Sequence, residues 1–283
     1  MTARRQFLLL PALLATLPSC AQPVAAPRPA ASAMPALDIG PDGLTQGGLA
    51  LGRVTPGSRV TLDGKPVQVA PDGRFAIGFG REAGPQARLA ATAPGGATET
   101  RELAIAKREW DIARLNGLPP AMVSPNAQQL ARIQAERKRL AAVRAVNSDL
   151  PFFAQPFIWP ARARISGVYG SQRILNGEPR APHLGLDIAA PTGTPVSAMG
   201  GGRVLLAMPL YFTGNTVILD HGHGITTLYA HLSAMDVQEG EEVRQGQRIG
   251  AVGATGRVTG PHLHLGLNWL STALDPAPVL PTM

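Results

Sequence analysis

Short runs of alternating apolar and polar residues, divided by turn residues, cover residues 37–107. Asp63-Gly64 and Asp72-Gly73 each stand between two such runs. Glycine supplies the positive φ that tight hairpin turns require, so both pairs predict hairpins. Strands this short and this closely spaced predict a small β-sandwich of immunoglobulin-like type. Because the block holds no cluster of catalytic residue types, we expect it to be a spacer or docking module.

A connector over residues 108–150 contains one predicted helix. Ser124 and Pro125 resemble an N-cap followed by proline at the first helical position. Apolar residues then recur at helical spacing, which predicts a helix over residues 125–147.

The predicted helix is basic and has only a thin apolar stripe. Leu130, Ile133 and Leu140 recur at helical spacing, together with Arg137 and Arg144. Five Lys and Arg against one Glu give the helix a local net charge of +4. The charge would suit adhesion to an anionic polymer or to lipid headgroups. The alternative, which we favour, is a solvated helix that packs by its stripe on one of the domains.

Glycine-punctuated strands return over residues 151–283. Five apolar runs predict strands at 203–207, 216–220, 225–229, 249–252 and 262–267. No long amphipathic helix interrupts these runs, so the sheet is expected to be largely antiparallel. The predicted fold is therefore mostly β, with an upstream sandwich, a helical connector and a downstream antiparallel domain.

Composition narrows the class of protein further. Hydrophobic residues make up 45% and charged residues 16% of the chain, with 32 Gly and 27 Pro. This is too apolar for a disordered chain and too rich in Gly and Pro for a helical bundle. No run of 18 apolar residues is present, which excludes a conventional membrane-spanning helix.

Residues 1–20 have the pattern of an export signal. Arg4 and Arg5 precede an apolar run that is too short to span a membrane. The paired arginines resemble a twin-arginine signal, but Ala3 stands where that pattern prefers a polar residue, so Sec export is the alternative. Residues 21–36 are rich in Ala and Pro and predict an extended tether.

Cys20 is the one cysteine of the chain, so no intramolecular disulfide can form. With Leu17 at −3 and Ser19 at −1 it resembles the lipidated cysteine of a bacterial lipobox, although Pro18 departs from the usual small residue. Ordinary cleavage beside Cys20 is the alternative. We expect export to the periplasm or cell envelope, with a membrane tether through a lipid on Cys20.

Charge and histidine are unevenly distributed. Residues 1–150 hold 18 Lys and Arg against 11 Asp and Glu, and residues 151–283 hold 8 against 8, so the net charge of +7 lies upstream. All six histidines lie downstream. A nucleic-acid enzyme would more naturally place its basic surface around its reactive groups, so we expect no nucleic-acid partner.

His183 and Asp187 could share a metal ion only through a bend in the chain. A helix would put them on one face, but Pro182 and Gly185 argue against a helix here. On a straight strand the two residues would lie about 13 Å apart, too far for one ion. A shared metal therefore requires Gly185 to bend the chain.

His262 and His264 alternate at the start of a predicted strand and share one face, about 6.6 Å apart along it. They can reach one metal centre with only one of them as a ligand. Two imidazoles on an apolar strand are costly to bury without partners, which disfavours a purely structural role. His231 lies at the end of another predicted strand. Alone it does not indicate a functional site, and it becomes a candidate only because the other histidines are present. His221 and His223 lie among glycines and resemble polar groups of a turn.

Six motifs occur in order between about residues 160 and 270. They are His183-x-x-x-Asp187, Ala190-Pro-Thr-Gly-Thr-Pro-Val196, Asp220-His-Gly-x-Gly224, Tyr229-Ala-His-Leu-Ser233, Gly246-Gln-x-Ile-Gly250 and Thr259-Gly-Pro-His-Leu-His264. Together they resemble the lysostaphin/LytM-type zinc endopeptidases of peptidase family M23. The resemblance implies a LytM-type catalytic domain, a Zn²⁺ cofactor and a peptidoglycan substrate.

The resemblance further implies that His183, Asp187 and His264 are the zinc ligands and that His231 and His262 are catalytic residues without a bond to zinc. Two histidines and one carboxylate leave a fourth position for water, whereas a structural site is closed, usually by cysteines. Zinc activates water and polarises a carbonyl. His262 would then take the proton and His231 would hydrogen-bond the oxyanion, with these roles open to reversal or sharing.

The expected activity is hydrolysis of peptide cross-links or stem peptides of bacterial peptidoglycan. We favour D-Ala-linked cross-links, because the lipobox-like start indicates a cell-envelope setting. One alternative is a catalytically inactive LytM-like activator of a peptidoglycan amidase, but such relatives usually lack one or more of the five site residues. A wall-binding module with a structural zinc is the other alternative, and the open fourth position argues against it.

Overall fold

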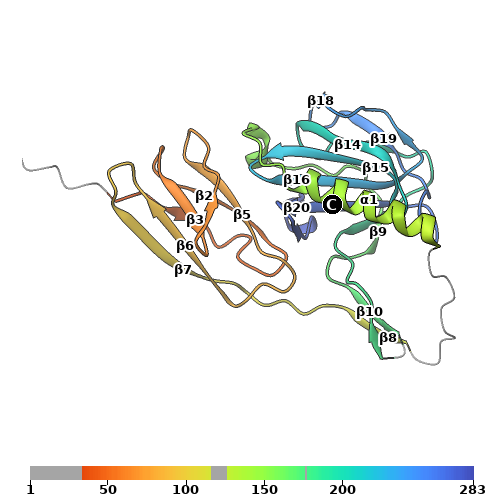
Figure 1. Cartoon of the computed structure of the whole chain (residues 1–283), viewed down its shortest axis with the longest axis horizontal. Helices are drawn as coiled ribbons and strands as arrows, with labels where there is room; N and C mark the ends of the chain where they lie inside the picture. Colours follow the sequence, from red (N-terminus) through yellow and green to blue (C-terminus); the bar gives the residue numbers. More distant parts are fainter. Residues whose placement is uncertain (1–33, 116–125, 176) are drawn as a thin grey trace, which may run out of the picture. The chain divides into compact units, whose positions relative to one another are not determined.

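The computed structural model describes residues 34–115, 126–175 and 177–283 (Figure 1). Contacts join these described residues into one compact unit. The predicted export signal and Cys20 lie outside the described residues. None of the described helices is long and apolar enough to cross a membrane.

Two antiparallel sheets form the upstream part. The first has the order β1-β2-β5, with β1 Asp38–Ile39, β2 Leu49–Arg53 and β5 Arg74–Gly78. The second has the order β4-β3-β6-β7, with β4 Lys65–Val67, β3 Arg59–Leu62, β6 Gln86–Thr92 and β7 Thr98–Ala104. Phe75, Ile77 and Leu89 are fully buried in one apolar core of this part. The β prediction is confirmed, and immunoglobulin-like topology remains a prediction.

The predicted hairpin at Asp63-Gly64 joins β3 to β4. Both residues have positive φ, 49° and 75°. Two successive left-handed residues match the twist of the strands that the turn connects. The turn chemistry thus sets the register of this hairpin.

The connector contains strand β8 (Ile112–Leu115) as well as helix α1 (Ala127–Arg144). The predicted cap is wrong, because α1 begins after Asn126 rather than after Ser124. Asn126 Oδ1 accepts a hydrogen bond from the Gln129 N–H, and the Gln129 side chain accepts one from the Asn126 N–H. This reciprocal pair satisfies two N–H groups that the helix itself leaves without partners. Ser124 and Pro125 lie outside the described residues.

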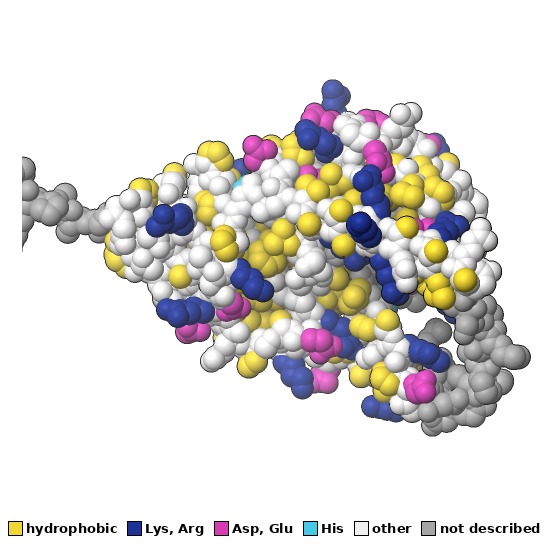
Figure 2. All heavy atoms as spheres, viewed as in Figure 1, with side chains coloured by type: hydrophobic (Ala, Val, Ile, Leu, Met, Phe, Trp, Pro, Cys, Tyr) yellow, Lys and Arg dark blue, Asp and Glu magenta, His cyan; other side chains and the backbone are white. Residues whose placement is uncertain are grey.

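Helix α1 packs against the downstream sheet through one side (Figure 1). Val143 is buried in one cluster with Leu206 and Ile218 of the sheet. The prediction that Leu130 belongs to the packed stripe is wrong, since its side chain is 47% exposed. Lys and Arg side chains lie over α1 on the face that Figure 2 shows. Packing, the interpretation that we favoured, is thus confirmed.

A largely antiparallel sheet of eight strands dominates residues 151–283 and confirms the predicted arrangement. Its order is β18-β14-β15-β16-β20-β12-β9, with β21 paired to β20. The strands are β9 Arg164–Gly167, β12 Leu186–Ala189, β14 Gly202–Leu210, β15 Gly214–Gly222, β16 Ile225–Leu232, β18 Glu242–Val243, β20 Leu263–Trp269 and β21 Thr272–Leu274. Each of the five predicted runs overlaps a strand, four of them in this sheet.

Smaller elements flank the large sheet. Strands β13 Pro195–Ser197, β19 Arg248–Ala251 and β17 Ala234–Met235 form a three-stranded sheet. Strand β10 (Gln172–Leu175) pairs with β11 (Glu178–Pro179) and, in parallel, with β8. Two short 3₁₀ helices cover Pro151–Ala154 and Ala277–Val279. Strand β16 is buried at every position. Its Thr227 hydroxyl has partners in His221 and Tyr229, whereas the Thr226 hydroxyl has no hydrogen-bond partner among the described residues.

His221 is a buried residue of β15, which corrects its prediction as a turn residue. Its Nδ1 lies 2.6 Å from the Gly201 carbonyl oxygen and its Nε2 lies 2.8 Å from Thr227 Oγ1. A carbonyl can only accept, so the Nδ1 carries a proton. Burial lowers the pKa of His221. His223 does lie in the turn that follows β15, with its ring stacked on Phe153.

Val143→Ala should lower the free energy of unfolding by about 1–3 kcal/mol, because it removes two buried methyl groups and leaves a cavity. Alanine is the better helix former, so the loss would report packing rather than helix propensity. Leu130→Ala is the control and should change stability by less than about 0.5 kcal/mol. Urea unfolding of both variants checks this, and equal losses would contradict the packing described for α1.

His221 should make the protein less stable as the pH falls. Its folded pKa is lowered, so below about pH 6.5 the unfolded chain takes up a proton that the folded protein refuses. The loss from one such group is at most about 1.4 kcal/mol per pH unit. In His221→Gln, the fall in unfolding free energy between about pH 7.5 and 5.5 should be smaller than in the wild type. An identical fall in both proteins would show that His221 is not held neutral.

Candidate metal centre

Two neighbouring strands carry two of the predicted metal ligands. Asp187 lies on β12 and His264 on β20, and the antiparallel register places these residues directly opposite each other. Directly opposed side chains in such a pair have Cβ atoms about 4.5–5.5 Å apart. Strand pairing alone therefore brings a carboxylate and an imidazole together.

His183 reaches the same point through a bend at Gly185, as predicted. Gly185 also leaves room for the second histidine, since a Cβ there would lie 2.5 Å from His264 Cε1. Gly167 does the same for the carboxylate, because a Cβ there would lie 2.4 Å from Asp187 Oδ2. Larger residues at either position would push the candidate ligands apart.

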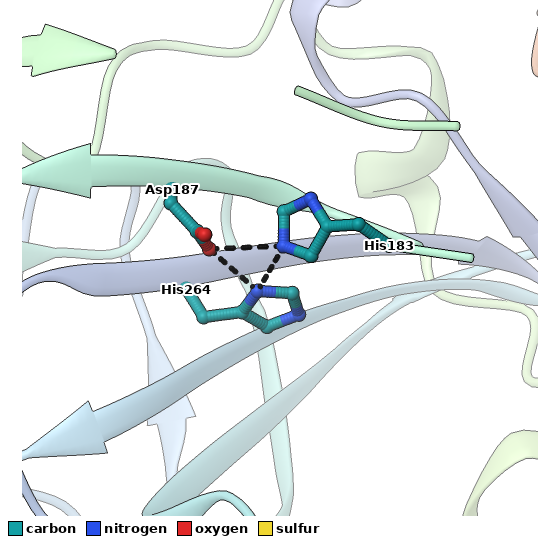
Figure 3. Close-up of side chains that lie close together, drawn as sticks. All are labelled: His183, Asp187 and His264. Atoms are coloured by element: carbon teal, nitrogen blue, oxygen red, sulfur yellow. Dashed lines mark hydrogen bonds and ion pairs between the residues drawn. The ribbon is translucent and has the colours of Figure 1, made fainter. Parts of the chain in front are cut away.

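The three side chains converge on one point (Figure 3). His183 Nε2 lies 3.0 Å from both Asp187 Oδ1 and His264 Nδ1, and His264 Nδ1 lies 2.8 Å from Asp187 Oδ1. In a tetrahedral zinc site with bonds of 2.0–2.1 Å, ligand atoms lie about 3.3 Å apart. The observed triangle is within a few tenths of an ångström of that spacing.

The hydrogen bonding of His183 shows why this triangle fits a cation. His183 Nδ1 lies 3.0 Å from the Val168 carbonyl oxygen, which can only accept, so the proton is on Nδ1. Nε2 then directs a lone pair at the Asp187 carboxylate, and two acceptors at this distance repel. A proton or a metal cation between them removes the repulsion. Two imidazole nitrogens and one carboxylate oxygen are the donor set of catalytic zinc sites.

His183 and Asp187 shift each other's pKa values in opposite directions. Burial lowers the pKa of His183, but the hydrogen bond and negative charge of Asp187 outweigh it and leave the pKa raised. Burial raises the pKa of Asp187, but hydrogen bonds from His183 and His264 hold it well below its usual range. Asp187 is therefore ionised at neutral pH and available as an anionic ligand.

The two predicted catalytic histidines lie beside the triangle. His262 Nε2 is 3.8 Å from Asp187 Oδ1. The His231 ring centre is 4.8 Å from that of His262 and 6.1 Å from that of His264. The structure thus brings all five predicted residues into one cluster, and leaves His221 and His223 with other partners.

One loop orients both of these histidines. His231 Nδ1 lies 2.9 Å from the Thr255 carbonyl oxygen, and His262 Nδ1 lies 2.9 Å from the Gly260 carbonyl oxygen. In its neutral form each ring therefore carries its proton on Nδ1 and presents Nε2 as an acceptor. Burial lowers the pKa of His231 to about 4, helped by the nearby His262 and His264, so His231 is neutral at physiological pH.

Sequence reasoning missed the groups that orient the histidines. The carbonyls of Val168, Thr255 and Gly260 belong to the backbone, and no side-chain pattern marks them. His231 also has a positive φ of 64°, which is uncommon for a residue with a side chain. Such backbone strain concentrates at functional sites.

Comparison with known proteins agrees with this geometry. Residues 181–276 match the description Peptidase family M23 and include all five clustered residues. Peptidoglycan DD-endopeptidase ShyA of Vibrio cholerae is 47% identical over 105 residues, which are 37% of this chain and 24% of ShyA. The Escherichia coli protein YgeR, an uncharacterised lipoprotein, is 29% identical over 189 residues, 60% of this chain and 72% of YgeR. The chain thus spans about a quarter of the length of ShyA.

One structural likeness extends beyond the matched segment. A crystal structure of a Pseudomonas aeruginosa protein assigned to peptidase M23 has a TM-score of 0.65 and 29% sequence identity. The match covers 83% of this chain and 94% of that one, so it includes part of the upstream residues. Residues 181–276 of the chain form a domain of peptidase family M23, as the sequence motifs implied.

Proposed function

We propose that the protein is a zinc endopeptidase that hydrolyses peptide cross-links or stem peptides of bacterial peptidoglycan. The observation that supports this proposal is the convergence of His183 Nε2, His264 Nδ1 and Asp187 Oδ1 on one point, a donor set that can hold a metal ion, with two oriented imidazoles beside it. A bound zinc ion would supply Lewis acidity, which polarises a carbonyl and makes water a nucleophile at neutral pH.

His262 is the general base of the proposed reaction. Its Nε2 is free to accept because its Nδ1 proton is donated to Gly260. Once protonated, the imidazolium would lie 3.8 Å from the Asp187 carboxylate, which stabilises the charge. A base whose protonated form is stabilised by a nearby carboxylate is well suited to take a proton from the attacking water and pass it to the leaving amine.

His231 also presents an acceptor, and this limits its role. With its proton committed to Thr255 and its pKa near 4, the neutral ring can accept a hydrogen bond from water but cannot donate from Nε2. We therefore assign His231 first to orienting the water. It can hydrogen-bond an oxyanion only after its Nε2 has received a proton during the reaction.

The proposed bond is a D-Ala-linked cross-link. ShyA, which shares this segment, is a peptidoglycan DD-endopeptidase, and this supports the same bond here. The alternative of an inactive amidase activator is less favoured, because all five residues are present and converge. For location we propose export, with a lipid tether at Cys20. The likeness to YgeR, a lipoprotein, supports the tether.

Alanine variants should separate zinc ligands from catalytic histidines. His183→Ala, Asp187→Ala and His264→Ala should lose both zinc and hydrolysis, because each removes one of three ligands. His231→Ala and His262→Ala should retain zinc and lose about 10²–10⁴-fold in turnover of purified peptidoglycan. His223→Ala, outside the cluster, is the control and should retain both. Metal content and peptide release are measured on the same preparations.

Zinc loss in His262→Ala would make that residue a ligand, and full activity in His231→Ala and His262→Ala would remove the proposed mechanism. Mass analysis of the released peptides identifies the bond. A wild-type protein that holds zinc but releases no peptide, and that stimulates a peptidoglycan amidase, would replace the endopeptidase proposal with the activator.

Cys20→Ala should move the protein from the membrane fraction to the soluble fraction, because it removes the thiol that would carry the lipid. Fractionation of cells, with mass analysis of the native N-terminus, makes the measurement. Ser19→Ala is the matched control and should leave the protein on the membrane. An unmodified N-terminus in the wild type, with unchanged fractionation of Cys20→Ala, would rule out the tether.

A further inference from the structure

One turn holds the candidate ligand His183 at three points. The His183 N–H donates to the Ser171 carbonyl, and its own carbonyl accepts from the Gly170 N–H, both at 2.8 Å. Its Nδ1 donates to the Val168 carbonyl at 3.0 Å. The backbone position and the ring orientation of His183 therefore both follow the position of residues 168–171.

Arg81, from the upstream β part, holds this turn in place. Its side chain is only 9% exposed, and its Nε–H donates to the Gly170 carbonyl at 2.9 Å. A second, longer contact of 3.4 Å reaches Gln172 Oε1. Glu82 pairs with the same guanidinium. A buried charged donor on a backbone carbonyl is among the stronger hydrogen bonds of a protein.

An aromatic layer supports the contact between Arg81 and the turn. The Arg81 guanidinium lies 5.2 Å from the centre of the Trp110 ring. Trp110 packs directly on Gly170, where φ is +84° and a Cβ would lie 2.0 Å from the ring. Trp110 also meets Tyr169 edge to face at 5.7 Å. Arg108 continues the layer, 4.7 Å from the Trp110 ring and paired with the buried Asp275.

We propose that Arg81, with Trp110 packed beside it, is a positioning residue for the candidate zinc ligand His183. The proposal rests on the ligand role that is proposed above for His183. Through it the upstream β part contributes to metal affinity, although Arg81 lies outside residues 181–276 that match the peptidase family. Removal of Arg81 would leave the Gly170 carbonyl without this donor and release the turn that fixes the ring.

The expected effect is on zinc affinity. Loss of a group that directly orients a metal ligand typically costs 10–100-fold in affinity. Arg81 acts one contact further out, so we expect Arg81→Met to weaken zinc binding by about tenfold, the lower end of that range. Arg81→Lys, which keeps the charge but not the planar fork, should show a smaller loss.

Arg101→Met is the matched control. Arg101 lies in the same upstream part, pairs with Glu99 at 2.7 Å and donates to the Leu37 carbonyl, so it has the same kinds of partner as Arg81. It has no described contact with the turn. Zinc dissociation constants of the full-length proteins are measured by competition with a chromogenic chelator, alongside thermal unfolding. If the role of Arg81 is merely structural, Arg81→Met lowers the thermal stability and leaves the zinc affinity unchanged. That result would overturn the proposal.

A second measurement does not depend on zinc. In the metal-free proteins, the His183 and Gly170 amides should exchange with deuterium faster in Arg81→Met than in the wild type, and at the wild-type rate in Arg101→Met. Unchanged exchange would also overturn the proposal. If the wild type fails to bind zinc, the proposed function fails, and amide exchange still decides the positioning role. If Arg81→Met does not fold, Arg81→Lys replaces it in both measurements.

Discussion

The antiparallel register between β12 and β20 is the constraint on which the candidate centre depends. It fixes Asp187 opposite His264, so the carboxylate and the imidazole meet before any other contact is considered. A shift of one residue in this register would turn one of the two side chains to the other face of the sheet. Two glycines then keep the space clear, Gly167 beside the carboxylate and Gly185 beside the imidazole. The position of the centre is thus set by the backbone, and the side chains only complete it.

Backbone carbonyls also decide what the imidazoles can do. The carbonyls of Val168, Thr255 and Gly260 each accept a hydrogen bond from the Nδ1–H of one histidine, so in the neutral rings the three Nε2 atoms are acceptors. One of these acceptors faces an ionised carboxylate and needs a cation, and the other two are available to water. Protein dipoles thereby select the tautomer without any additional charged residue. Within the described residues, the Asp187 carboxylate lies within 4 Å of a ring nitrogen of His183, His262 and His264.

Much of this arrangement could be predicted from the sequence, because alternation marks strands and glycine marks turns and bends. The five clustered residues were predicted from motifs, and the bend at Gly185 from distance alone. It was harder to predict where an element begins or ends when two neighbouring residues could serve equally well. Ser124 and Asn126 are both good caps, and the reciprocal bond with Gln129 decided for Asn126. His221 precedes Gly222 and Gly224, which resemble a turn, yet β15 continues through it, and the ring nitrogens of His221 find partners in Gly201 and Thr227. Leu130 fits the helical period but projects where the sheet does not reach.

The groups that no motif marks are those that act through the backbone. Val168 and Gly170 contribute only a carbonyl and an N–H to His183, and any residue type could supply the carbonyl. Arg81 is one basic residue among 18 upstream, and only its burial against the 168–171 turn distinguishes it. Residues 181–276 therefore contain every side chain of the candidate centre but not every group that orients them. A centre with this construction is a property of the folded upstream and downstream parts together, because the carbonyl that fixes His183 belongs to a turn that Arg81 and Trp110 hold from outside that segment.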